Sequence, residues 1–100
     1  MKLENSKEDL IVCIRSAMLE GAEWMSLLVV MPEHPAPQLI IDPKENFTAR
    51  LNFLRNTYNE NLEHAHNPAV RIVGFSSGSS VSKVSKIYKL YMKKLQEGEK

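Results

Sequence analysis

A proline-rich stretch between two apolar runs constrains this chain more than any other feature of its sequence. Three prolines within residues 32–37 fix backbone angles and lack amide hydrogens, so this connector is extended and cannot be helical. Residues 27–30 before it are apolar at every position, which is typical of a strand covered on both faces. We therefore predict a strand over residues 25–31, a short strand over 38–41 and a hairpin across the connector.

The residues before the first strand predict a helix. Asn5 and Ser6 precede two acidic residues, which is the arrangement of a capping box at a helix start. Apolar residues then recur at spacings of three and four, and Gly21 suits the helix end because glycine accepts the left-handed conformation. One uninterrupted helix up to residue 31 is the alternative, because the same apolar stripe extends past the glycine.

Asp42 and Pro43 carry the clearest boundary signal in the chain. An aspartate can accept hydrogen bonds from the free amides of a helix start, and proline fits the first helical position. Apolar residues follow at helical spacing, namely Phe47, Leu51, Leu54, Tyr58 and Leu62. We predict a helix that begins at this cap and ends at Asn67 and Pro68 at the latest.

The last third of the chain predicts a strand and a helix. Residues 69–75 place apolar side chains on both faces of a strand, and the Ser/Gly-rich residues 76–80 form either a flexible linker or a loop leading into the next helix. The final helix is predicted over residues 80–96, where an apolar seam follows helical spacing. The seam consists of Val81, Val84, Tyr88, Tyr91 and Leu95.

These elements predict an α+β fold in a single domain of 100 residues, in the order α-β-β-α-β-α. The helix between the second and third strands makes these two parallel through a right-handed crossover. A strand order of 2-1-3 places the doubly apolar strand in the centre. We therefore expect a small three-stranded mixed sheet packed with about three helices, of which the last, over residues 80–97, could be semi-independent.

Charge is divided unequally along the chain. Residues 81–100 contain six lysines and two glutamates, whereas residues 1–80 contain ten acidic and seven basic residues. The overall charge of +1 therefore combines a basic C-terminal helix with a mildly acidic body. Such an asymmetry indicates an interaction surface and says little about chemistry.

The lysines of the last helix are the strongest candidate for a binding surface. By helical spacing three of them share one face and two flank it. The five residues that we expect to bind a partner are Lys83, Lys86, Lys89, Lys93 and Lys94. They suit an acidic protein partner or the phosphates of nucleic acid, and the alternative is a solvated face that keeps a terminal helix in solution.

Three further candidates lack the residues that their chemistry requires. Residues 76–80 have the position of a phosphate-binding loop but not the lysine of a Walker loop. His64 and His66, expected near the end of the central helix, lack the additional ligands of a tetrahedral metal site. Cys13, the one cysteine, shows no local signature of a nucleophile and fits a reducing compartment. We therefore expect no enzymatic activity, no cofactor and no metal.

Residues 29–32, 37–47, 58–62 and 70–74 together resemble small uncharacterised proteins of prophages and other mobile elements in Gram-positive bacteria. The resemblance covers about half of the chain. Its matched positions are loop prolines, a helix cap and core residues, so it transfers no functional residue. Such proteins often bind and inhibit host machinery, including antiviral defence such as CRISPR effectors, and the resemblance implies a function of this kind.

We therefore expect a non-enzymatic, phage-derived cytoplasmic protein that binds a host protein or nucleoprotein through its basic helix and inhibits or modulates it. The alternative is a nucleic-acid-binding accessory protein that uses the same helix. In either case we expect a monomer or homodimer. We expect no membrane association, because the longest apolar run is too short to span a bilayer.

Overall fold

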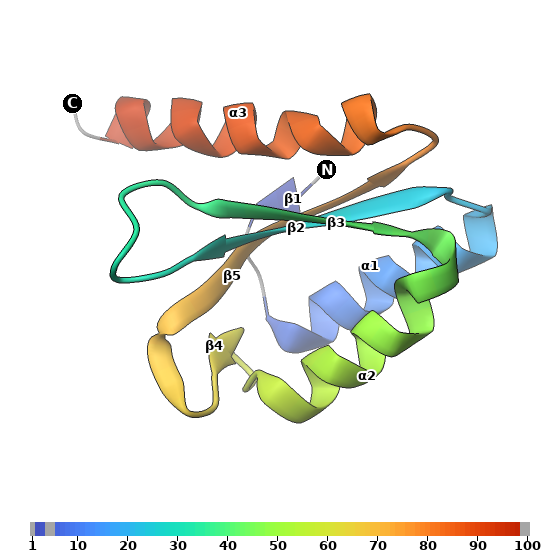
Figure 1. The fold of residues 1–100 in the computed structure, drawn as a ribbon, viewed down its shortest axis with the longest axis horizontal. Coiled ribbons are helices and arrows are strands. Elements are labelled where there is room, and N and C mark those ends of the chain that lie inside the picture. Colours follow the sequence, from blue (N-terminus) through green and yellow to red (C-terminus); the bar gives the residue numbers. More distant parts are fainter. Residues whose placement is uncertain (1, 4–5, 99–100) are drawn as a thin grey trace.

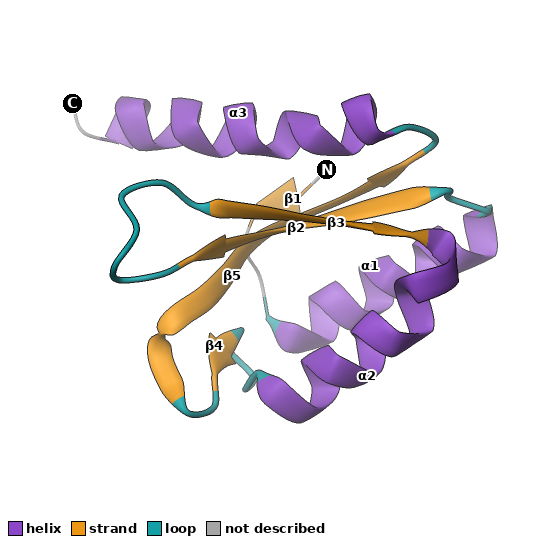
Figure 2. Cartoon of the chain, viewed as in Figure 1, coloured by secondary structure: helices purple, strands orange, loops and turns teal. Residues whose placement is uncertain are grey.

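Three helices enclose an antiparallel sheet in the computed structural model, which describes residues 2–3 and 6–98 (Figure 1). Helices α1 (Lys7–Glu20) and α2 (Phe47–Thr57) cover one face of the sheet, and α3 (Val81–Gly98) lies alone on the other face. Figure 2 shows the same arrangement, with purple helices on both sides of the orange strands. The predicted α+β class is confirmed.

The sheet has more strands than the sequence predicted, and its described strands pair antiparallel. Its strands are β1 (Lys2–Leu3), β2 (Trp24–Val30), β3 (Gln38–Pro43), β4 (Glu63–His64) and β5 (Asn67–Gly78). Their order is β1-β5-β2-β3, with β4 paired to β5, and every pair is antiparallel.

The central position predicted for β2 is confirmed, whereas the predictions of three strands and of a mixed sheet are wrong. Strands β3 and β5 do run in the same direction, as a crossover through α2 requires. However, β2 lies between them and pairs antiparallel with each, so no parallel ladder forms. The additional strands β1 and β4 have two residues each, which is too short for any periodic pattern in the sequence.

Strand β2 divides its side chains between two cores, as the apolar run over residues 27–30 indicated. Met25, Leu27 and Val29 pack into the cluster beneath α1 and α2. Ser26 and Leu28 point to the opposite face, where the Ser26 hydroxyl donates a hydrogen bond of 2.7 Å to the carbonyl of Val84 in α3. The strand therefore holds both helical layers to the sheet.

Helix α1 begins and ends as its sequence predicts. The Ser6 hydroxyl accepts a hydrogen bond of 3.2 Å from the amide of Asp9, and Gly21 closes the helix with φ of +78°. The contribution predicted for Asn5 lies outside the described residues. Residues 21–23 then lead into β2, which begins at Trp24, so the alternative of one helix up to residue 31 is wrong.

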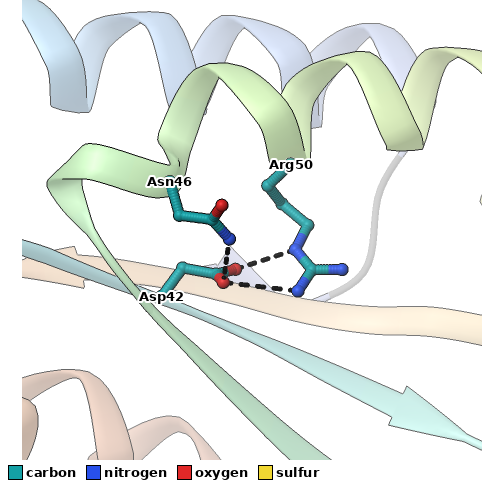
Figure 3. A network of polar contacts seen from close by, with 3 residues as sticks. All are labelled: Asp42, Asn46 and Arg50. Carbon is teal, nitrogen blue, oxygen red and sulfur yellow. Dashed lines mark hydrogen bonds and ion pairs between the residues drawn. The ribbon is translucent and has the colours of Figure 1, made fainter.

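Asp42 does not cap α2, and that prediction is wrong. It lies in β3 and is only 4% exposed, and its carboxylate faces α2 (Figure 3). The carboxylate accepts hydrogen bonds from Asn46 Nδ2 at 2.6 Å and from Arg50 Nε at 2.8 Å and Nη2 at 3.3 Å. Because Pro43 remains extended, a short 3₁₀ turn over Lys44–Asn46 precedes α2.

Helix α2 ends at Thr57, ten residues before the latest predicted end at Asn67. The Asn59 side chain accepts hydrogen bonds from the amides of Asn61 and Glu63, which closes a turn instead of continuing the helix.

Strand β5 begins at Asn67 and continues through Gly78, so it takes up residues 76–78, which were predicted as part of a linker or a helix-entry loop. Within the part of the chain that the structure describes, no helix is both long and apolar enough to cross a membrane.

Candidate partner-binding face

Helix α3 is fixed to the sheet by a narrow buried stripe. Val84 and Ile87 are fully buried, and the hydrogen bond from Ser26 to the Val84 carbonyl lies between helix and sheet. Val81 and Leu95, predicted as the ends of the apolar seam, are 41% and 44% exposed. The predicted seam is therefore wrong at both ends, and it omitted Ile87.

The start of α3 is set by Ser80, whose hydroxyl accepts a hydrogen bond of 3.2 Å from the Lys83 amide. Residues 76–78 pair with β2, and Ser76 is buried. The flexible linker that residues 76–80 could have formed is therefore absent. Only Ser79 and Ser80 separate β5 from the helix, so α3 is joined to the sheet by a short turn.

Opposite the buried stripe, α3 presents the predicted lysines to solvent. All five are exposed, namely Lys83, Lys86, Lys89, Lys93 and Lys94. We call these residues the lysine face. At 1.5 Å rise per residue, it extends roughly 16 Å along the helix axis. Among the described helices, α3 alone lies on this side of the sheet (Figure 1). Its exposed lysines therefore lie on the outer surface of this layer.

No lysine of the lysine face forms an ion pair with a described acidic residue. The two ion pairs in the described part of the chain join Lys44 to Glu23 at 3.2 Å and Arg50 to Asp42 at 2.8 Å. Meanwhile, residues 6–80 contain nine acidic and six basic residues. The fold thus separates a basic helix on one side of the sheet from a mildly acidic remainder.

The histidine pair lies in β4 and the turn after it, not at a helix end. The His64 and His66 ring centroids are 5.9 Å apart, and His64 Nδ1 accepts a hydrogen bond from the His66 amide. His64 also contacts Tyr58 edge to face, and burial raises the pKa of that phenol while the charge of Arg50 opposes the rise. Among the described residues, no three His, Cys, Asp or Glu side chains are grouped to hold a metal ion.

Cys13 is half-buried beside a shallow groove between α1 and β5. The polar residues that line this groove beside Cys13 are Ser16, Glu20, Ser76 and Ser77, and none of its described lining residues is a histidine. The described residues of this groove therefore bring no imidazole to the thiol.

Sequence reasoning missed the buried cluster that Asp42 forms with Asn46 and Arg50. Asn46 and Arg50 lie four and eight residues after Asp42, and this spacing alone is a weak signal of contact. It indicates a cluster only once β3 is known to end beside α2.

Comparisons with protein-family models, with curated proteins and with solved structures found no match for this chain.

Proposed function

We propose that this chain is a non-enzymatic binding protein that docks on an acidic surface of a host protein or nucleoprotein through the lysine face of α3. One observation carries the proposal: five exposed lysines follow a helix whose other side is anchored, and none of them forms an ion pair with a described acidic residue. Unpaired like charges on one surface attract an oppositely charged partner and accelerate its association.

The resemblance of residues 29–75 to prophage proteins supports a partner in the host and an inhibitory or modulating effect on it. The same resemblance, together with the single cysteine, supports a cytoplasmic location. The host partner, the inhibitory or modulating effect and the location therefore rest on the resemblance and the composition.

Nucleic acid is the second candidate partner, because the same five exposed lysines suit phosphates. Two observations favour the protein partner. Tyr88 and Tyr91, the aromatic residues of α3, are half-buried, so they offer little surface for stacking on bases. The acidic remainder of the chain also repels a long polyanion.

The test compares capture of partners from a Gram-positive host lysate, with and without nuclease treatment, by the native chain and two variants. One variant carries Lys86→Glu, Lys89→Glu and Lys93→Glu. The matched control carries Arg15→Glu, Arg55→Glu and Arg71→Glu, which are exposed residues outside α3 and give the same net charge. We expect a protein that is captured after nuclease treatment by the native chain and the control but not by the lysine variant.

A fluorescence titration of labelled DNA and RNA duplexes at two salt concentrations decides between the two partners. We expect weak binding at physiological salt, because the positive charge is confined to one short helix. Submicromolar binding at physiological salt that the lysine variant loses would make nucleic acid the primary target. Two salt concentrations are compared because phosphate contacts weaken steeply with salt. Equal protein capture by both variants would contradict a role for the lysine face.

A further inference from the structure

Strand β3 forms an open edge of the sheet. It pairs with β2 on one side, and no described strand pairs with its other side. Alternate backbone amides and carbonyls on that side therefore point away from the sheet, as at any free edge. The opposite side of the sheet ends differently, because the two-residue strands β1 and β4 both pair along β5.

Edge strands of monomeric proteins usually carry features that prevent pairing, such as lysines, inner prolines or bulges. Strand β3 has none of them between Gln38 and Asp42. Its register with β2 is continuous, its three middle residues are aliphatic and half-buried, and Asp42 is neutralised by Arg50. The edge is thus apolar and without net charge, whereas α3 is basic and the remainder of the chain is mildly acidic.

We propose that β3 is the interface between two copies of this chain, which pair antiparallel across a two-fold axis at Ile40. In this register Ile40 of one copy lies opposite Ile40 of the second copy, and Leu39 of one copy lies opposite Ile41 of the second copy. Gln38 lies opposite Asp42, so five residues of each strand take part.

The ladder ends on both sides where Pro37 meets Pro43, and neither of these residues has an amide hydrogen to donate. A symmetric edge pair of this kind is self-complementary, which favours a second copy over an unrelated strand.

Burial also supports the register. Ile40 pairs with Leu27 on the α1 and α2 side, whereas Leu39 and Ile41 pair with Leu28 and Ser26 on the α3 side. All three aliphatic side chains would lose part of their remaining exposure in the dimer.

A stable interface takes roughly 800 Å² from each partner, about an eighth of the 6132 Å² surface of the chain. Because five paired residues supply less than this area, we expect a reversible dimer that depends on concentration. The two-fold axis is perpendicular to the sheet, so both α3 helices lie on the same face. Two lysine faces would then point in one direction.

Light scattering of the native chain over a dilution series is the first measurement. We expect twice the single-chain mass of 11.4 kDa at high concentration and the single-chain mass after dilution. The second measurement tests the register in a Cys13→Ser background. Ile40→Cys places two thiols opposite each other, so a mild oxidant should produce a covalent dimer.

Gln38→Cys is the matched control for the cross-link, because its two thiols would lie roughly 13 Å apart along the strands. It should remain a single chain under the same conditions. The proposal is overturned by a single-chain mass at every concentration, which would leave the edge to a strand of another protein. It is also overturned by a dimer that Ile40→Cys does not cross-link, or by equal cross-linking of both variants.

Discussion

Asp42 and Arg50 hold β3 against α2, and their side chains differ in exposure. The Asp42 side chain is 6% exposed and that of Arg50 is 21% exposed. Removing the guanidinium would leave a carboxylate in the sheet with Asn46 as its remaining side-chain partner. Removing the negative charge would leave a cation that can reach water. The two partners of this ion pair are therefore unequal in what their loss costs.

We expect Arg50→Met, which keeps the apolar stem, to lower the free energy of unfolding by about 3–5 kcal/mol, because it leaves a buried charge unpaired. Asp42→Asn keeps the shape and part of the hydrogen bonding, so its cost should be about 1.5–3 kcal/mol. Urea unfolding of both variants gives the comparison. Equal losses would mean that the carboxylate is not held in a dry site.

At the scale of elements, periodicity located α3, whose bounds Val81–Gly98 lie within two residues of the predicted 80–96, but not the ends of its buried stripe. A stripe of residues at spacings of three and four identifies one side of a helix, but it does not say how far the supporting surface extends. Val84 is buried on the sheet, whereas Val81 and Leu95 are not. Similarly, Tyr58 and Leu62 follow the stripe of α2 and are buried, yet they lie in the turn that Asn59 closes. Local turn chemistry determined that boundary.

Two substitutions in α3 test how far along the helix its packing against the sheet extends. Ile87→Ala should lower the free energy of unfolding by about 2–5 kcal/mol, because this side chain is fully buried against the sheet. Leu95→Ala should change it by no more than about 0.5 kcal/mol, because the side chain is 44% exposed. Thermal or denaturant unfolding is sufficient for both. A large loss from Leu95→Ala would restore the longer seam that the sequence predicted.

At the scale of the whole molecule, the sequence predicts the class of the fold, the three helices and the central strand. The predicted order 2-1-3, with the second and third strands running in the same direction, already makes both neighbouring pairs antiparallel, so the expected mixed sheet did not follow from it. The strands β1 and β4 are too short to leave a periodic pattern. The sequence locates the lysine face, because charge and helical spacing are both local. The buried pair of Asp42 and Arg50 depends on tertiary contact and could not be predicted in this way.

Separation of charge between α3 and the remainder predicts how the molecule behaves near its isoelectric point. At pH of about 7.9 the net charge is close to zero, so a uniform distribution would give no retention on a sulfonate resin. The resin interacts with those charges of the protein that lie within a Debye length of it, which is about 10 Å at 0.1 M salt. We expect the native chain to be retained at low salt through the lysine face.

The two triple variants distinguish the effect of the lysine face on retention from the effect of net charge. The variant with Lys86→Glu, Lys89→Glu and Lys93→Glu should pass through the resin. The control with Arg15→Glu, Arg55→Glu and Arg71→Glu has the same net charge and keeps the patch, so it should elute at higher salt. Both should fold like the native chain, because all six side chains are exposed. Elution of the two variants at the same salt concentration would show that the lysines do not act as one surface.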